Sequence, residues 1–447
     1  MPGMFLLCLL AADPSSWWES YGDPVLNRLV ARAVERNPDV RIAAARLAEA
    51  RALSGDARSA LLPAVNFNSS AQQIRGGFQN GIIRITPGAA PGSGTALISA
   101  FETGLLAGSL DTRWELSFWS GSAKRFSAAK ADVEAGKESL EDLRLIVSAE
   151  TARAYFELRG FERQLAAARR NRAAQADLLA LTEERARAGL APGLDVERQR
   201  AALASLDAAI EPLEWQRRLR LHRLALLTGD RELAERGLDA APQEEIRLPQ
   251  LGAGVDSALL ARRPDLRAAQ ARIVAAMSRR KAAKADLLPR VLLTGLAGRQ
   301  ATSVSGLSLG AGNFFGVGPQ LVLPVFTGGR LRAQIQASEA RLEQTRIEYE
   351  REVLAAFLEA EDALAGYRAQ RARLEQLRQA RRAAAVSLEL ATELYRAGVG
   401  DYLGVLDTQR SLLDLDLAAA EAESAAAVQS VLLYKALAGG WPEQPGS

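Results

Sequence analysis

The sequence predicts a mixed α and β fold, mostly α, in which an internal two-fold repeat gives each chain four strands. Three copies are expected to close a trimeric 12-stranded transmembrane β-barrel that is continuous with a long α-helical barrel. Two observations predict this fold. Strand-like segments pass directly into helical patterns of roughly 70 residues, far longer than the average of about 11–12 in soluble domains. The same order of elements then occurs a second time along the chain.

Composition restricts the class of protein. With 24% charged and 48% hydrophobic residues, the 447-residue chain is neither disordered nor a bundle of membrane helices, and it holds no run of 18 apolar residues for a transmembrane helix. Its 56 basic and 53 acidic residues are interleaved along helices, which favours solvated helix faces over a nucleic-acid surface. One Cys and one His exclude an internal disulfide and a His cluster for zinc, so we expect no cofactor and no metal.

The first 23 residues are expected to form an extended N-terminal segment. Met4–Ala12 is an apolar run without the basic residues that open a signal peptide, so it is either the end of an export signal or a plain disordered terminus. Cys8 in this run is a candidate acylation site, although Leu7 before it is bulkier than a lipid-attachment motif normally has.

The first repeat, residues 24–229, contains the clearest strand. Its apolar positions alternate with polar ones, as expected for a strand with one apolar face, at Leu110, Thr112, Trp114, Leu116 and Phe118. Arg75 to Gly104, rich in Gly, Pro and Ser, is expected to be a long loop before it. The predicted elements are helices at about 24–62 (interrupted at Asn37-Pro38), 121–189 and 192–228, and strands at about 63–75 and 105–120.

The second repeat, residues 256–439, has the same order. Leu321, Leu323 and Val325 share one face of a strand, and Gly298–Asn313 is expected to be a Gly/Ser loop before it. The predicted elements are strands at about 289–299 and 314–326 and helices at about 256–288, 328–398 and 402–438. Residues 230–255 are expected to form an irregular equatorial connector, and residues 440–447 a tail.

Matched segments support the duplication. Leu61-Leu62-Pro63 before the first strand corresponds to Leu287-Leu288-Pro289, and Arg187-Ala188-Gly189 after the first long helix corresponds to Arg396-Ala397-Gly398. Both long helices carry apolar or small residues every seven positions, which predicts supercoiling of neighbouring helices as in coiled coils.

The strand pattern indicates a membrane channel built by several copies. Four strands with one apolar face cannot close on themselves, and an open edge is not tolerated in lipid. Two chains would give eight strands with a filled interior, whereas three give twelve and leave a passage. The predicted lipid-facing residues are Leu110, Trp114, Leu116, Phe118, Leu321, Leu323 and Val325. A soluble sheet would use the same alternation, so it stays open as an alternative.

At several points the chain resembles the TolC/OprM-type outer-membrane efflux proteins, the outer membrane factors, in their NodT-like branch. The resemblance covers nearly the whole length. It is carried in order by Trp17-Trp18 with Gly22-Asp23-Pro24, by Arg262-Arg263-Pro264-Asp265, by Gly318-Pro319-Gln320-Leu321 running to Leu323-Pro324-Val325-Phe326-Thr327-Gly328-Gly329, and by Gly398-Val399 with Tyr402-Leu403 and Val405-Leu406-Asp407.

The resemblance implies the exit duct of a tripartite efflux system in the outer membrane of a Gram-negative cell, extending into the periplasm. The implied partners are two further copies in a homotrimer, a periplasmic adaptor (membrane fusion) protein, an inner-membrane pump of the RND type and outer-membrane lipid, without nucleic acid. Such a duct passes small molecules, including drugs, through a gated passive channel and is not an enzyme. The incomplete export signal around Cys8 departs from the family pattern.

The resemblance also places functional residues. Leu403 and Asp407, four apart and hence on one helical face, correspond to the family's periplasmic gate, with Tyr395 placed to tie neighbouring helices. Without the resemblance, Leu403 would pack in a helix seam and Asp407 would face solvent. The candidate adaptor-contact turns, which also suit ordinary helix capping by glycine, are Arg187, Ala188, Gly189 and Leu190, and Arg396, Ala397, Gly398 and Val399.

Other classes of protein fit the sequence less well. No nucleophile–base pair or phosphate loop stands out among its residues, which argues against an enzyme. A periplasmic adaptor would carry a single helical hairpin with flanking β segments, whereas here the unit occurs twice. A helical coiled-coil scaffold would not explain two strand pairs at matching points of a duplicated unit.

Overall fold

The computed structural model describes residues 14–77, 100–116, 119–238, 246–249, 262–304 and 307–439. By its internal contacts the chain forms two compact units, which are described separately. Unit 1 comprises Met1–Ala48, Glu134–Gln270 and Ile347–Ser447, and unit 2 comprises Glu49–Val133 and Ala271–Arg346. Each unit draws on both halves of the sequence, so this division differs from the two predicted repeats.

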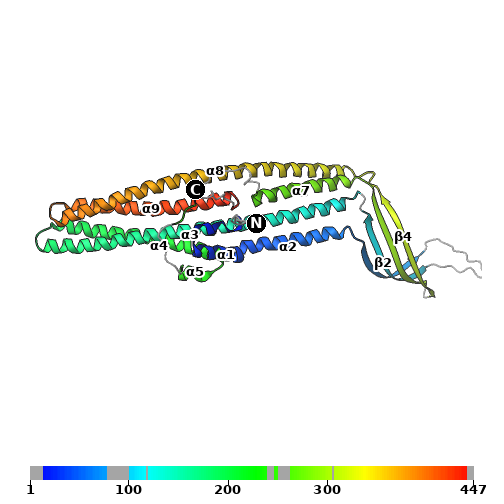
Figure 1. Ribbon diagram of the computed structural model, residues 1–447. Helices are drawn as coiled ribbons and strands as arrows, with labels where there is room; N and C mark the ends of the chain where they lie inside the picture. Colours follow the sequence, from blue (N-terminus) through cyan, green and yellow to red (C-terminus); the bar gives the residue numbers. More distant parts are fainter. Residues whose placement is uncertain are drawn as a thin grey trace, which may run out of the picture. The chain divides into compact units, whose positions relative to one another are not determined.

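Unit 2 holds a four-stranded antiparallel sheet with the order β1-β2-β3-β4 (Figure 1). The strands lie in the sheet in the order in which they occur in the chain, although helices α3 to α7 separate β2 from β3 in the sequence. Among the described residues the outer edges of the first and last strands have no partner. The strands are β1 Ala64–Gly77, β2 Ala100–Leu116, β3 Arg290–Val304 and β4 Leu307–Val322.

The strand register gathers apolar side chains on one face of the sheet. Residues directly opposite in an antiparallel pair lie on the same face. Phe67 pairs with Leu110, Leu110 with Ala297, and Ala297 with Phe315, so one apolar row crosses all four strands. The rows beside it on this face include Val65, Trp114, Leu116, Val291, Leu293, Val317 and Leu321.

The opposite face is richer in polar and small residues. It carries Asn66 and Asn68 on β1 and Asp111 on β2. Both asparagine amides donate to the Asp111 carboxylate, the one from Asn66 over 3.3 Å. On β1 and β2 the two faces therefore differ in chemistry, as in a sheet that separates an apolar medium from water.

Several predicted strand bounds were wrong. Gly298–Asn313 was expected to be a loop, but β3 extends to Val304 and β4 begins at Leu307, because glycine and serine continue the ladder on the small-residue face. Likewise β1 reaches Gly77 and β2 begins at Ala100 inside the predicted loop. At the other ends Trp119 and Ser120, which were expected to belong to the second strand, are not in a strand, and β4 ends at Val322, earlier than expected.

One glycine in β3 is required by close approach of the neighbouring strands. A Cβ at Gly298 would lie 2.5 Å from the carbonyl oxygen of Gly108, 2.6 Å from the Phe314 ring and 2.8 Å from Cβ of Ser109. Phe314 is the β4 residue directly opposite Gly298, so its ring covers the space that a side chain would fill. Only glycine fits this position.

Helices account for the rest of the described chain. The two helices α3 and α4 run side by side as a hairpin, and so do α8 and α9 (Figure 1). The short helix α5 lies within residues 230–255, which were expected to be irregular throughout. The helices are η1 Pro14–Tyr21 (3₁₀), α1 Pro24–Arg36, α2 Pro38–Ser59, α3 Gly121–Arg187, α4 Gly193–Thr228, α5 Arg231–Arg236, α7 Pro264–Ala285, α8 Arg330–Arg396 and α9 Tyr402–Ala436. None of the helices in the described ranges is long and apolar enough to cross a membrane.

Small residues allow the helices of unit 1 to approach closely. A Cβ at Gly160 of α3 would lie 2.6 Å from the Ser424 side chain of α9, and one at Gly366 of α8 would lie 2.8 Å from Gln429. From Ser424 to its end, α9 is buried at most positions, among them Ala426, Ala427, Val431, Leu433 and Ala436. The C-terminal half of α9 is therefore anchored in the core of unit 1.

A charged cluster joins three helices of unit 1. The Arg263 guanidinium, which is 9% exposed, donates to Asp265 and to Glu359 over 2.8 Å each and to the Ala436 carbonyl over 3.0 Å. Lys435 donates to the other Glu359 oxygen over 3.0 Å. Burial alone would raise the pKa of Glu359, but the cationic side chains of Lys435 and Arg263 lower this pKa below its ordinary value. The cluster holds the start of α7 against α8 and the end of α9.

Asp142 of α3 lies beside this cluster and makes stability depend on pH. Burial, followed by the nearby Asp265 carboxylate, raises the pKa of Asp142 from 3.8 to about 6. The folded state then binds more protons than the unfolded state between these values, so stability falls as pH rises through that window. At about pH 7.5, Asp142→Asn is expected to stabilise the fold by about 1–2 kcal/mol, discounted for partial exposure.

The check is a pair of melting temperatures in detergent. Asp142→Asn should raise the melting temperature at about pH 7.5 and leave it unchanged near pH 4, where wild-type Asp142 is already protonated. Glu141→Gln is the matched control, because Glu141 is exposed and pairs with Arg144 at the surface of the same helix. An equal gain at both pH values would contradict the titration of Asp142.

Candidate functional site

The two helical hairpins of unit 1 end in turns of the same hydrogen-bonded type. Gly189 has a φ of +74° and Gly398 a φ of +79°, a region that glycine adopts without strain. In the first turn Leu190 N donates to Arg185 O over 2.8 Å, and in the second Val399 N donates to Leu394 O over 3.1 Å. Each glycine N–H also donates three residues back, which completes a Schellman motif twice.

All eight turn residues are exposed, Arg187 to Leu190 and Arg396 to Val399. The apolar side chains that close the two motifs project most, Leu190 at 71% and Val399 at 78% exposure. An apolar side chain beside an exposed arginine at each of two equivalent turns is a suitable contact surface for another protein.

The first turns of α9 have two chemically different faces. Tyr402, Val405 and Gln409 are buried, whereas Leu403 and Asp407 on the opposite face are exposed, Leu403 at 49%. Asp401 caps the helix by accepting from Gly404 N over 2.9 Å. The predicted gate residues therefore share one free helix face, as their four-residue spacing requires.

Tyr395 does not share that face. Its ring is buried, lies 4.7 Å from the Arg185 guanidinium of α3 and meets the Tyr402 ring edge-on at 6.0 Å. Arg185 also donates to the Tyr395 carbonyl over 3.2 Å. Tyr395 thus links α3, α8 and α9 within one chain, behind the face that carries Leu403 and Asp407.

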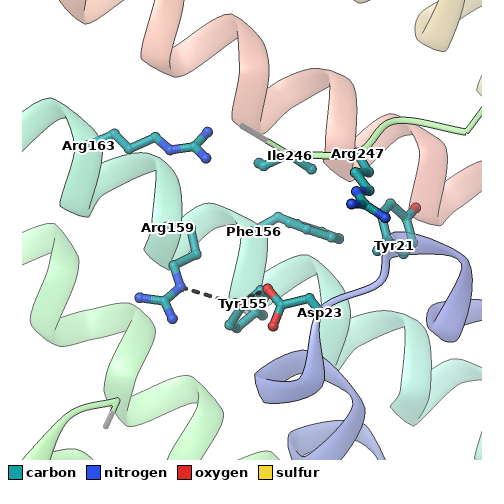
Figure 2. Close-up of a pocket in the computed structure, with 8 residues that line it drawn as sticks. All are labelled: Tyr21, Asp23, Tyr155, Phe156, Arg159, Arg163, Ile246 and Arg247. Carbon is teal, nitrogen blue, oxygen red and sulfur yellow. Dashed lines mark hydrogen bonds between the residues drawn. The ribbon is translucent and has the colours of Figure 1, made fainter. Parts of the chain in front are cut away.

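The segment after η1 is held in a small pocket of unit 1 (Figure 2). Asp23 caps α1 through Val25 N at 2.8 Å, and its second oxygen accepts from the Tyr155 hydroxyl. Arg159 donates to the same hydroxyl over 3.1 Å. Burial and the bond to Asp23 raise the pKa of Tyr155 well above its ordinary range. These contacts fix the start of α1 against α3 and leave no space for a small-molecule ligand.

The predicted lipid-facing residues divide into three groups. Leu110, Trp114, Leu116 and Leu321 lie on the apolar face of the sheet. Leu323 and Val325 lie beyond the end of β4 and are 53% and 88% exposed. Phe118 lies outside the described residues, as does Cys8. On the apolar face Phe67 and Phe315 are 70% and 90% exposed in the single chain, a large uncovered apolar surface.

Sequence reasoning missed two sets of residues. The bond between Asp23 and Tyr155 joins positions 132 apart in the chain, which no local pattern reveals. A buried glutamine pair, Gln175 and Gln199, lies between α3 and α4. A polar residue at a buried heptad position was the available signal for the glutamines. The described residues contain no group of His, Cys, Asp and Glu side chains that could hold a metal.

The fold and these surfaces are those of a membrane channel protomer. The sheet has one apolar face and two unpaired edges among the described strands, and the helical hairpins end in exposed turns. Residues 29–230 and 255–439 match the family model of the outer membrane efflux protein. The chain belongs to the outer membrane efflux protein family. It is the outer-membrane channel of an efflux pump from a Gram-negative bacterium, and not an enzyme.

Known relatives cover almost the whole chain. The pyoverdine export outer membrane protein OpmQ of Pseudomonas aeruginosa is 32% identical over 443 residues, covering 96% of this chain and 88% of OpmQ. The outer membrane protein OprJ of the same organism is 29% identical, with coverage of 97% and 88%. The solved outer-membrane channel OprN superimposes with a TM-score of 0.82 at 31% identity, covering 96% of this chain and 93% of OprN.

Proposed function

We propose that this channel is the exit duct of a tripartite efflux system, a homotrimer that passes small molecules from a periplasmic adaptor and an inner-membrane pump to the exterior. The observation that carries the proposal is the sheet of unit 2, which has one apolar face and two outer edges without a partner among the described strands. Such a sheet is stable in lipid only when other copies complete it.

Closure by copies of the same chain follows from the strand order. If β4 of one copy pairs with β1 of the next, every edge is satisfied, because the interface is head-to-tail and can form a ring. Three copies give twelve strands, enough to surround a water-filled passage. The face with Phe67, Leu110 and Phe315 would then meet lipid, and the face with Asn66, Asn68 and Asp111 would line water.

The free face of α9 supports a gate in the periplasm. In a threefold assembly Leu403 and Asp407 would each form a ring of three side chains. Three carboxylates near one axis repel one another and favour cations and water over anions. Tyr395, buried against Arg185 and Tyr402, would hold this part of α9 to its own hairpin.

The two Schellman turns are the proposed contacts for the adaptor. Their residues, Arg187 to Leu190 and Arg396 to Val399, are exposed and repeat the same backbone geometry, so one adaptor surface could bind both. We further infer an inner-membrane pump of the RND type. Pyoverdine is a candidate cargo, since the relative OpmQ is a pyoverdine export protein. Acylation of Cys8 remains part of this proposal, and intact-mass measurement of the native N-terminus tests it.

The oligomer is the first test. Detergent-extracted protein is expected to have a protein mass three times that of the 447-residue chain, measured by light scattering with the detergent subtracted. In planar lipid bilayers the same preparation is expected to form ion-conducting channels. A chain that stays monomeric in water without detergent would contradict the proposal and favour a soluble scaffold.

Neutralising the proposed carboxylate ring is expected to change ion selectivity. Asp407→Ala should raise single-channel conductance and lower the preference for cations severalfold, because the mutual repulsion and the local negative potential disappear. Asp414→Ala is a control on the same helix, since Asp414 is also exposed but two turns further from the hairpin end. If Asp407→Ala leaves both conductance and selectivity at wild-type values, the gate lies elsewhere.

A further inference from the structure

A layer of buried amides lies between α3, α4 and α9, close to the hairpin ends of unit 1. Gln175, Gln199 and Gln409, one from each helix, are 2%, 0% and 4% exposed. The Gln175 amide donates to the Gln199 carbonyl oxygen. Three glutamines at one level of a helical seam are unusual, because such positions normally hold apolar residues.

The helix register places Gln409 at the level of the other two. On α3 and α9, Gly160 approaches Ser424, and Leu178 packs against the cluster formed by Tyr395, Tyr402 and Val405. In this antiparallel register, one turn from Leu178 toward the start of α3 leads to Gln175, and one turn beyond Val405 leads to Gln409. Gln409 also lies on the same buried face of α9 as Tyr402 and Val405.

The layer is not fully hydrogen-bonded in this conformation. The Gln199 amide nitrogen and the Gln409 carbonyl oxygen are buried and have no hydrogen-bond partner in the described chain. Each unpaired buried group destabilises the conformation that contains it, and a change of packing that pairs the group removes this penalty. A donor and an acceptor both remain available, so a shifted α9 could pair them.

The position of the layer connects it to the exposed face of α9. Gln409 is buried two residues after Asp407 on the same helix, so any rotation or slide of this part of α9 moves both side chains together. Further along α9 the packing is dense and apolar, from Ala426 to Leu437. The part of α9 that contributes to this layer is therefore packed less stably than the C-terminal half of the same helix.

We propose that Gln175, Gln199 and Gln409 are positioning residues of the gate: the unpaired amide groups of Gln199 and Gln409 destabilise the resting, closed packing of α9 and become paired when α9 moves to open the channel. The inference rests on the proposed gating function of Leu403 and Asp407. In this proposal the layer sets the equilibrium between the closed and the open packing of α9.

The test replaces the unpaired acceptor by an apolar side chain of similar volume. Gln409→Met removes the unpaired oxygen from the closed packing and the new hydrogen bond from the open packing, so it should lower the ratio of open to closed channels roughly tenfold. Gln409→Glu buries a charge in the closed packing and should raise the same ratio. Single-channel recording of trimers in bilayers measures the ratio for both variants and for wild type.

Hydrogen exchange provides a second measurement that does not require conduction. In detergent-extracted trimers, backbone amides of residues 402–412 should exchange more slowly in Gln409→Met and faster in Gln409→Glu than in wild type. If wild-type trimers do not conduct, the proposed channel activity fails, whereas the exchange rates still decide whether the layer controls the packing of α9.

A matched control separates gating from stability. Gln370 of α8 also has a buried, unpartnered amide oxygen, and it lies one turn from Gly366, which approaches Gln429 in the anchored half of α9. Gln370→Met should raise the melting temperature without changing the open ratio or the exchange of residues 402–412. The proposal is overturned if Gln409→Met only raises the melting temperature, as Gln370→Met does, or if Met and Glu at position 409 shift the open ratio in the same direction.

Discussion

Gly298→Val is expected to prevent assembly of the sheet. The first atom of the new side chain would lie 2.5 Å from the Gly108 carbonyl oxygen and 2.6 Å from the Phe314 ring. The Gly108 oxygen belongs to the backbone of β2, which cannot move away without disturbing the β2–β3 ladder. Ordinary overpacking costs about 1–3 kcal/mol, and a clash with backbone exceeds that range. The measurement is the fraction of chain recovered from membranes as a detergent-stable oligomer, which should fall to near zero.

The neighbouring position is a matched control. Ala297→Val adds side-chain atoms in the same strand but on the opposite, exposed face, beside Leu110 and Phe315. It is expected to assemble like wild type. Equal recovery of Gly298→Val and Ala297→Val would show that β2 and β3 do not approach as closely as described.

Arg263→Ala is expected to destabilise unit 1 by about 3–5 kcal/mol, the usual result of removing one partner from a buried ionic cluster. The change leaves Asp265 without its partner, Glu359 with Lys435 alone, and the Ala436 carbonyl without this donor. Arg263→Lys should recover only part of the loss, because an ammonium cannot reach three acceptors as a guanidinium fork does. Chemical or thermal unfolding of the detergent-extracted protein measures both variants.

An exposed pair supplies the comparison for this loss. Arg144→Ala removes a surface ion pair with Glu141, in which both side chains are nearly half exposed, and should change stability by less than about 1 kcal/mol. If Arg263→Ala were no worse than Arg144→Ala, the cluster would not hold α7 against α8 and α9.

Hydrophobic periodicity predicted the elements in which large apolar residues alternate clearly with polar or charged ones. In β2 the alternation from Leu110 to Leu116 is clear, because large apolar residues face one side and charged ones the other. The same signal failed from Gly298 to Asn313, because small and polar residues occupy this part of the ladder and resemble a loop. A strand of a water-lined sheet carries little hydrophobic contrast where glycine replaces the apolar residues.

The candidate site was predictable where one helix determines it. The four-residue spacing of Leu403 and Asp407 was enough to place both on one face of α9. The role of Tyr395 was less accessible, since its contacts with Arg185 and Tyr402 come from two other helices. The glutamine layer was missed because the heptad position of one glutamine does not reveal which residues face it, and only the register of three helices brings the three glutamines together.

The unpartnered edges of β1 and β4 have a consequence for biogenesis. Until a chain enters the proposed trimer, those edges are open to strand addition by any extended polypeptide, and the aromatic surface beside them is uncovered. Assembly of that trimer would therefore compete with aggregation through the same unpaired strand edges.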